Sequence, residues 1–414
     1  MSAPVVAIAL HDGYFSAGSG AGRSNRALIG AVATALGPRV HLVLLPVLVD
    51  PASPEYDRVT HHAAQRRLAT VSHQVIGLDN GTGGMRRFGD LAAFEHLGRH
   101  AAKVINPLMR RHERGLLIAI DQPFAGLGPL LDVPAGWRLL YLPRSAAAHH
   151  PDTMAAAWEH HGLAGWTAKG ATAGAISGHM RALLARNGVP AGQILDVPGG
   201  LTPDDRVPLS LAPRLPVPAQ ERGFLLAMGR AQPYKGFEDL LDALSLLTRQ
   251  HLRLPHLLLA AVTDGEPTAY QRHLQQRVTG LQFAATLWTR FDPGLPGLLH
   301  HPKLRAVVVP SRTEPLGRIP LEAFAAGAAP VVATTAGGLA ETVIDGATGF
   351  SAPPGNAHAL ATAVHRALTA PPDQVDRLRA AGAALVAARD YTTCITGVLE
   401  TLAPWAVAAR AANS

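Results

Sequence analysis

The chain has almost no cysteine, and its apolar segments are short. Of its 414 residues one is a cysteine, Cys394, so no intramolecular disulfide framework can form and a reducing compartment is indicated. The longest apolar runs, such as residues 40–49, are interrupted by proline and are too short to span a bilayer. The start of the chain lacks a basic n-region, so residues 5–10 are expected to form a first strand and not a signal peptide. We therefore expect a soluble, cytoplasmic protein.

Aromatic residues are also scarce. Phe, Trp and Tyr make up 5% of the chain, which leaves few stacking platforms for a nucleic acid. The formal net charge is +7, but the basic residues are scattered and cluster only briefly, as at Arg110, Arg111 and Arg114. We therefore expect no nucleic-acid partner. Attraction of an anionic small molecule, weak contact with an anionic membrane surface, and a generally arginine-rich composition each account for the charge.

The order of apolar segments predicts two α/β domains. Strand-like runs alternate with helical stretches, which is the pattern of a parallel sheet covered by helices. The length and a hydrophobic content of 48% suffice for two cores. The expected strands are 5–10, 40–47, 116–120 and 138–142 in the first half, and 224–227, 257–262, 306–309 and 330–333 in the second.

Prolines mark the boundary between these domains. Five of them fall within residues 201–220, which by composition is an interdomain linker. We expect a first domain over residues 1–200 and a second domain over residues 221–390. A C-terminal helix is expected within residues 391–414.

The most informative segment is residues 310–322, which read PSRTEPLGRIPLE. An apolar run that ends at residue 309 predicts a buried parallel strand, followed by a loop and then a helix over 321–326. Ligands of doubly wound domains bind beyond the carboxyl ends of such strands, where Glu314 and Glu322 would lie. Even on one helix these carboxylates would be about 12 Å apart, whereas glycosidase pairs lie roughly 5 to 10 Å apart. The spacing favours contacts with two ends of one extended ligand over attack on a single bond.

Backbone amides at the start of the expected helix extend this site. They have no intrahelical acceptor and carry the partial positive charge of the helix N-terminus, which suits a sugar hydroxyl or a diphosphate. Glu314 would accept hydrogen bonds from sugar hydroxyls, and Glu322 from the two hydroxyls of a ribose. The alternative is that both glutamates are solvated residues of a helix face and a loop. The expected donor-binding amides are those of Leu316, Gly317, Arg318 and Ile319.

A second motif, RAQPYKG at residues 230–236, follows the apolar strand 224–227. The turn there aims Arg230 and Lys235 at the same crevice as Glu314. Lysine is rare in this chain, with four among 37 basic residues, and a compact ammonium fits between phosphate oxygens where a planar guanidinium does not. We expect the two cations to bind a phosphate-bearing ligand. The alternative is a surface lysine beside a turn.

These motifs resemble those of the family 4 retaining glycosyltransferases (glycosyl transferases group 1), which have the GT-B fold. The resemblance extends over about residues 224–355 and includes a third motif, GGLAETVIDGATGF at residues 337–350. It implies two Rossmann-like domains facing a central cleft, with the donor bound by the second domain and the acceptor by the first. It also implies that the last helix crosses back to the first domain. By this resemblance Arg230, Lys235 and Glu314 are the catalytic residues, and the two cations neutralise the donor diphosphate without a metal ion.

The first domain matches that family only in outline. A glycine-rich loop follows the expected strand 5–10, and by resemblance Gly20 and Gly22 would approach the donor phosphate. The alternative is a flexible loop that binds no ligand. Many family members carry a histidine after the strand that corresponds to 138–142, where this chain instead reads PRS. The acceptor candidates are polar residues near expected strand ends: His11, Asp12, Asp121, Arg144 and His149.

The sequence thus predicts retaining transfer of a hexosyl group (glucosyl, N-acetylglucosaminyl or mannosyl) from a UDP- or GDP-linked sugar to a hydroxyl. The expected acceptor is a small polar molecule such as a sugar, a cyclitol or a specialised metabolite. Neither a cofactor nor a metal ion is expected. One alternative is a lipid-linked acceptor at a membrane surface, with residues 103–114 as the membrane face. Another is an isomerase similar to the sugar-nucleotide 2-epimerases. The sequence does not indicate the oligomeric state.

Overall fold

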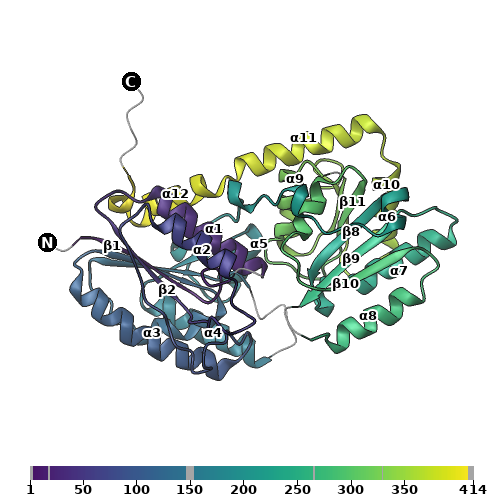
Figure 1. Cartoon of the computed structure of the whole chain (residues 1–414). Coiled ribbons are helices and arrows are strands. Elements are labelled where there is room, and N and C mark those ends of the chain that lie inside the picture. The colour runs from purple at the N-terminus through teal and green to yellow at the C-terminus, as the bar shows by residue number, and fades with distance from the viewer. Residues whose placement is uncertain (1–2, 17–18, 146–152, 264–265, 329, 409–414) are drawn as a thin grey trace. The chain divides into compact units, whose positions relative to one another are not determined.

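The computed structural model describes residues 3–16, 19–145, 153–263, 266–328 and 330–408 of the chain (Figure 1). The chain divides into two compact domains. The first consists of residues 1–202 and 390–414, and the second consists of residues 203–389. Each contains one parallel sheet with helices, so the α/β fold class predicted from the sequence is confirmed.

The first domain is built on a seven-stranded parallel sheet with the order β3-β2-β1-β4-β5-β6-β7. Val5 pairs with His41 of β2 on one side and with Gly115 of β4 on the other. The winding of the chain therefore reverses between β1 and β4, and this switch point is where doubly wound sheets bind ligands. The strands are β1 (Val5–Leu10), β2 (His41–Pro46), β3 (His73–Val75), β4 (Gly115–Ile120), β5 (Trp137–Leu142), β6 (Thr172–Ala175) and β7 (Ile194–Asp196).

Helices of the first domain connect these strands, and the last one returns from the end of the chain. Helix α1 begins at residue 20, where the Ser19 hydroxyl accepts a hydrogen bond from the Gly22 amide and caps the helix. The helices are α1 (Gly20–Ala35), α2 (Arg58–Leu68), α3 (Leu91–Arg111), α4 (Thr153–Ala168), α5 (Gly178–Arg186) and α12 (Tyr391–Leu402), with the 3-10 helices η1 (Gln122–Leu130), η3 (Ala191–Gln193) and η9 (Pro404–Ala406).

The second domain repeats this topology in a six-stranded parallel sheet with the order β10-β9-β8-β11-β12-β13. Its switch point lies between β8 and β11. The strands are β8 (Phe224–Arg230), β9 (His256–Thr263), β10 (Ala285–Arg290), β11 (Leu304–Val309), β12 (Val331–Thr334) and β13 (Phe350–Ala352). The α-helices are α6 (Val217–Arg222), α7 (Phe237–Arg249), α8 (Ala269–Thr279), α9 (Arg318–Ala325), α10 (Ala357–Thr369) and α11 (Pro372–Ala388). The 3-10 helices are η4 (Pro203–Asp205), η5 (Leu209–Leu211), η6 (Pro233–Lys235), η7 (Leu295–His300) and η8 (Gly337–Glu341).

The central strands are buried along nearly their whole length. Every residue of β1 and β4 is buried, as are the first five of β8. Parallel strands covered on both faces have continuous apolar sequences, which is why these strands were predictable. Strands β3, β6, β7, β10 and β13, four of which lie at sheet edges, were not predicted. All residues of β3 and β10 are at least partly exposed, so their sequences lack that pattern.

The proline-rich stretch expected as a linker is grouped with the second domain from residue 203 onward. Its prolines begin or precede the short helices η4, η5 and α6. Proline is common at helix starts because its fixed φ angle matches that of a helix. Leu215 and Ala219 are buried in the core of the second domain, and Asp205 is buried as well. This segment therefore packs as part of the domain.

Helix α12 packs along α1 of the first domain (Figure 1). The Tyr391 amide donates to the Leu201 carbonyl at 3.2 Å, and the Ala408 amide donates to the Ala35 carbonyl at 2.9 Å. Helix α12 and the residues after it therefore pack as part of the first domain. In the part of the chain that the structure describes, no helix is long and apolar enough to cross a membrane.

Candidate active site

The switch point of the second domain brings two of the predicted motifs together. Strands β8 and β11 are parallel neighbours, with Leu226 opposite Val307. Arg230 ends β8 and Lys235 lies in the turn that follows it, while Glu314 lies in the loop after β11. Because the carboxyl ends of parallel neighbours share one edge of the sheet, these side chains meet there.

Lys235 and Glu314 form an ion pair between the Nζ and Oε2 atoms. The two side chains are 15% and 16% exposed, so the pair is shielded from bulk water but still open to a ligand. The ammonium also lies over the Tyr234 ring, 5.4 Å from its centroid, where the ring face attracts a cation. An ammonium has three N–H donors, so the bond to Glu314 leaves donors for a phosphate.

Contacts between the two loops hold this pair in place. Gly236 has a φ of 67°, and a Cβ atom there would lie 2.0 Å from the Pro310 carbonyl oxygen, so glycine is required. The Arg312 amide donates to the Tyr234 carbonyl at 2.7 Å. The Arg312 guanidinium also donates to both carboxylate oxygens of Asp239, at 2.8 and 2.7 Å. The loop after β11 is therefore attached to both η6 and α7.

Arg230 is the exposed member of the predicted group. Its Nη2 atom donates to the Tyr234 hydroxyl at 3.0 Å. Tyr234 thus contacts the cationic groups of both Arg230 and Lys235. Two cations at the end of one strand can attract a polyvalent anion.

The start of α9 lies against the third motif. Gly317, the residue before α9, has a φ of 86° and offers no side-chain cap. A Cβ on Gly317 would lie 2.3 Å from Leu339 Cδ2, and one on Gly338 would lie 2.5 Å from the Pro315 carbonyl oxygen. The Gly338 amide donates to the Glu314 carbonyl at 2.9 Å. These two glycines let the loop that contains Glu314 approach η8 closely. Within α9, Pro320 at the third position has no N–H group to donate. The predicted amides 316–319 therefore lie at an uncapped helix start, with the Leu316 side chain buried and Ile319 packed on the core.

Glu322 and Arg318 belong to a buried ion-pair cluster with Asp205. Arg318 lies 2.8 Å from Glu322 (Nε to Oε1) and 2.6 Å from Asp205 (Nη2 to Oδ1). Burial lowers the pKa of Arg318, but the two carboxylates outweigh it and hold that pKa above its ordinary value. Glu322, expected at a ribose, therefore already has a cationic partner, and its side chain is 3% exposed. Asp205 could not be identified from the sequence, because it lies in the proline-rich stretch, which has no periodic pattern.

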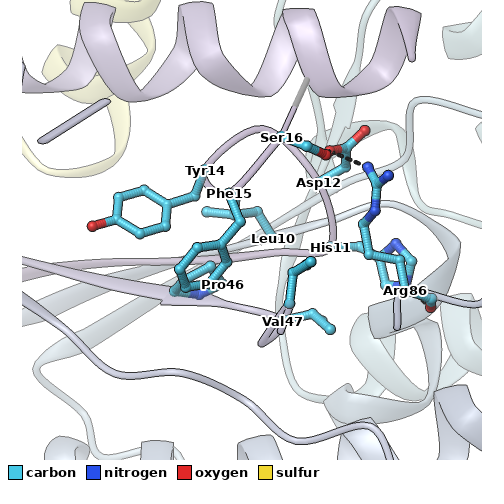
Figure 2. Close-up of a pocket in the computed structure, with 10 residues that line it drawn as sticks. Leu10, His11, Asp12, Tyr14, Phe15, Ser16, Pro46, Val47 and Arg86 are labelled. Atoms are coloured by element: carbon cyan, nitrogen blue, oxygen red, sulfur yellow. Dashed lines mark hydrogen bonds and ion pairs between the residues drawn. The ribbon is translucent and has the colours of Figure 1, made fainter. Parts of the chain in front are cut away.

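In the first domain, the carboxylate of Asp12 is bonded within its own loop. It accepts hydrogen bonds from the Gly13 amide at 2.9 Å, the Ser16 hydroxyl at 3.0 Å and the Ser19 hydroxyl at 2.8 Å. It also forms an ion pair with Arg86 at 2.6 Å, with both side chains at most 5% exposed. Figure 2 shows this pair at the polar end of a small hollow beside β1 and β2. Arg86 was not identified from the sequence, because it lies in a loop far along the chain.

His11 is buried beside the same arginine. One ring nitrogen, Nε2, lies 2.6 Å from the Arg86 carbonyl oxygen, and the rings of Phe88 and Phe94 contact its ring edge to face. Burial lowers the pKa of His11 to about 4, although Asp12 partly opposes the shift. His11 is therefore neutral at pH 7, with Nε2 protonated to donate to that carbonyl.

Asp121 and Arg144 shape the loop after β5. Asp121 has a φ of 70°, rare for a residue other than glycine. Its Oδ1 atom accepts hydrogen bonds from the amides of Arg144 and Ser145 at 3.0 and 2.9 Å. The Arg144 guanidinium donates to the Tyr391 hydroxyl at 3.0 Å. Both predicted acceptor residues thus have partners within the first domain, and His149 lies outside the described residues.

The two predicted glycines of the N-terminal loop differ in their surroundings. Gly20 is exposed, and a Cβ there would meet nothing within 4 Å. Gly22 is buried, its amide donates to Ser19 at 2.8 Å, and its carbonyl oxygen would lie 2.8 Å from a Cβ on Gly13. Gly20 is therefore the better placed of the two to approach a ligand. Among the described residues, no three His, Cys, Asp or Glu side chains are grouped to hold a metal ion.

Comparison with known sequences places the second domain in a family. Residues 216–384 match the family described as glycosyl transferases group 1. The glycogen synthase of Mycobacterium tuberculosis is 34% identical over 176 residues, which are 42% of this chain and 41% of that protein. The GDP-mannose-dependent alpha-(1-6)-phosphatidylinositol monomannoside mannosyltransferase of Mycolicibacterium smegmatis is 35% identical over 159 residues, or 36% of this chain and 40% of that protein. The chain thus spans about two fifths of the length of these relatives.

Solved structures match the whole chain. Sucrose-phosphate synthase of Thermosynechococcus elongatus superposes with a TM-score of 0.72 and 24% identity, covering 97% of this chain and 98% of that one. Anabaena HepE in complex with UDP and glucose gives a TM-score of 0.66 and 20% identity, covering 97% and 99%. At these identities the likeness establishes the fold. The chain therefore has the GT-B fold, and its residues 216–384 match the glycosyl transferases group 1 family.

Proposed function

We propose that this protein is a hexosyltransferase that moves a hexosyl group from a nucleoside diphosphate sugar to a hydroxyl of a small polar acceptor, with retention of configuration. The observation that carries the proposal is the Lys235–Glu314 ion pair at the switch point of the second domain. Arg230 and the uncapped start of α9 lie in the same loops. Together they offer two cations, a carboxylate and the positive end of a helix to one extended anionic ligand.

Each residue has a role in this proposal. Lys235 and Arg230 bind the diphosphate and stabilise the charge that it gains as it leaves. Glu314 orients the Lys235 ammonium through their ion pair and accepts hydrogen bonds from the hydroxyls of the sugar. Glu322, held by its ion pair with Arg318, is the proposed contact of the ribose hydroxyls. Two fixed cations next to the diphosphate supply the positive charge that a metal ion supplies in other transferases.

The proposed transfer makes one bond and breaks one. The bond between the anomeric carbon and the β-phosphate oxygen breaks, and that oxygen keeps the electron pair. The acceptor hydroxyl oxygen bonds to the same face of the anomeric carbon, and its proton passes to the departing phosphate. The products are the glycoside and the nucleoside diphosphate, and no protein nucleophile is consumed.

The choice of donor and acceptor is also a proposal. The named relatives include a GDP-mannose-dependent enzyme and a protein solved with UDP and glucose, which supports a UDP- or GDP-linked hexose. A small polar acceptor is favoured over a lipid by helix α3, the sequence candidate for a membrane face. Its Ile105 and Met109 are buried in the core, and Val104 and Leu108 pack against that core. The single cysteine supports function in a reducing compartment such as the cytoplasm.

Nucleotide binding tests the donor half of the proposal. UDP, GDP and ADP, with and without their sugars, are added to the full-length protein, and the unfolding temperature is recorded. A ligand at 100 times its dissociation constant stabilises the folded state by about 2.7 kcal/mol. We expect Lys235→Ala and Glu314→Ala to reduce both this stabilisation and transfer. Lys303→Ala, which removes an exposed lysine of the same domain, is the matched control and should behave like the wild type.

Product analysis tests the chemistry. The anomeric configuration of the glycoside, measured by NMR, should match that of the donor. Activity should survive EDTA, because the cations that face the diphosphate are side chains. Inversion, or activity that is lost in EDTA and restored by magnesium, would contradict the mechanism.

A further inference from the structure

Arg312 connects the loop that contains Glu314 to the first turn of α7. Its guanidinium donates to both carboxylate oxygens of Asp239, with Nε to Oδ2 at 2.8 Å and Nη2 to Oδ1 at 2.7 Å. The Asp239 side chain is 10% exposed, whereas that of Arg312 is 44% exposed. Two parallel hydrogen bonds between planar groups fix their mutual orientation as well as adding energy. The pair therefore holds the loop in one orientation relative to α7.

The backbone of Arg312 is bonded to the turn that carries Lys235. The Arg312 amide donates to the Tyr234 carbonyl at 2.7 Å. On the other side of Lys235, a Cβ atom on Gly236 would lie 3.4 Å from Asp239 Oδ2, so the carboxylate is packed close to the turn. Arg312 thus contacts the chain on both sides of Lys235. Its amide bonds to the residue before it, and its guanidinium bonds to the helix after it.

Tyr234 links Arg312 to the two cations of the proposed donor site. Its hydroxyl accepts a hydrogen bond from Arg230 Nη2 at 3.0 Å, and the centroid of its ring lies 5.4 Å from the Lys235 ammonium. The Arg312 amide fixes the backbone from which that ring projects. Lys235 in turn pairs with Glu314, which follows Arg312 by two residues. The contacts therefore close a ring that begins and ends at the loop of Arg312.

The Arg312 guanidinium already has its counter-ions. The hydrogen bonds with Asp239 raise the pKa of Arg312 above its ordinary value, and the nearby Glu238 carboxylate raises it further. Both carboxylates lie in the first turn of α7. The Lys235 ammonium, in contrast, keeps N–H donors beyond the one that it gives to its glutamate partner. We therefore expect Lys235, and not Arg312, to contact the diphosphate.

We propose that Arg312 is a positioning residue for glycosyl transfer. Held in place by Asp239, it sets the geometry of the Lys235–Glu314 ion pair. This inference rests on the proposed function, because it takes the Lys235 ammonium as the group that stabilises the leaving diphosphate. Such a cation acts only if it is already aimed at the developing charge, and a displacement of about 1 Å costs on the order of 100-fold in rate. Because that charge develops in the transition state, loss of the positioning residue lowers kcat more than it raises the donor KM.

The central experiment compares Arg312→Met with Arg277→Met in the full-length protein. Arg277 also pairs with a carboxylate of α7, that of Asp242 at 2.6 Å, but it lies on α8 and not in the loop after β11, so it is the matched control. We expect Arg312→Met to lower kcat about 10-fold and to change the donor KM by at most about 3-fold. Arg277→Met should match the wild type in both. An unchanged kcat in Arg312→Met would overturn the proposal, whatever the donor KM.

A double-mutant cycle tests whether Arg312 acts through Asp239. Asp239→Asn leaves no unpaired buried carboxylate, so it remains informative if Arg312→Met folds poorly. We expect Asp239→Asn alone to lower kcat about 5-fold, and adding Arg312→Met should then lower it little further, because both changes remove one pair. Glu238→Gln, which changes the neighbouring acid of the same turn and its bond to His273 at 2.8 Å, should leave kcat unchanged. Fully multiplicative effects of the two changes would contradict the proposal.

Hydrogen exchange separates this inference from the proposed function. The amides of residues 312 and 338 donate to the Tyr234 and Glu314 carbonyls, at 2.7 and 2.9 Å. In the absence of any nucleotide, Arg312→Met should speed exchange at both amides, and Arg277→Met should not. If the wild type binds no nucleoside diphosphate, the proposed function fails. If it binds one but exchange at these amides is unchanged in Arg312→Met, the positioning role of Arg312 is wrong.

Discussion

Removing Arg318 should destabilise the second domain strongly. Arg318→Met keeps much of the side-chain volume but leaves Asp205 and Glu322 without a cation, and their side chains are 2% and 3% exposed. Breaking a buried ion pair by removing one partner costs about 3–5 kcal/mol. Two carboxylates are left here, so we expect the upper end of that range. A typical domain has about 5–15 kcal/mol of stability in total, so the loss is a large fraction.

The assay is urea unfolding of the full-length protein, monitored by pulsed hydrogen exchange at the backbone amides of residues 318–325. These amides report on the second domain separately, which matters because a two-domain chain need not unfold in one step. The matched control is Arg366→Met, which removes an arginine from the exposed pair with Asp345 and should cost at most about 1 kcal/mol.

A triple variant separates charge from packing. Replacing Asp205 by Asn, Arg318 by Met and Glu322 by Gln removes all three charges, and it should recover most of the stability that Arg318→Met alone loses. A loss below about 1 kcal/mol for Arg318→Met would refute the reasoning. So would a triple variant that is less stable than the single one.

Three further predictions concern single residues of the two domains. Gly317→Ala should abolish transfer, because the residue has a positive φ and a Cβ would lie 2.3 Å from Leu339 Cδ2; donor titration and thermal unfolding should both show the loss. Gly20→Ala should leave thermal stability unchanged, because a Cβ there meets nothing within 4 Å, yet weaken nucleoside diphosphate binding measured by calorimetry. The free energy of unfolding should fall by up to about 3 kcal/mol as the pH drops from about 6.5 to 4. The reason is that the pKa of His11 is lowered to about 4 in the folded protein, so the unfolded chain binds more protons in that window. In His11→Gln, whose amide can still donate to the Arg86 carbonyl, urea unfolding at each pH should show a smaller slope; an unchanged slope would contradict the assignment.

The proposed donor site was largely predictable because its residues follow buried parallel strands. Such strands have apolar sequences, and their carboxyl ends share one edge of the sheet. Lys235 and Glu314 could therefore be placed together although they are far apart along the chain. The glycines that let their loops approach, such as Gly236 and Gly317, were visible as breaks between periodic segments.

The partners of the buried polar residues could not be predicted in the same way. Asp12 follows a strand end, as expected, but whether its carboxylate faces a ligand or the protein depends on Arg86, which lies in an irregular loop. Asp205 lies among prolines that indicated a linker, and its pairing with Arg318 is a long-range contact. An irregular loop has no sequence period that reveals which way its side chains point.

Packing of α12 on α1 has a consequence for how the protein is made. The first domain needs residues 390–408, which leave the ribosome after residues 203–389, and the latter form one uninterrupted stretch. The second domain can therefore complete its core while residues 390–408 are still being synthesised, although domains usually fold in order from the N-terminus. Until Tyr391 arrives, the Arg144 guanidinium lacks its hydroxyl partner and the α12-facing side of α1 is uncovered. A nascent chain halted near residue 389 should accordingly resist protease in its second half while remaining sensitive in its first.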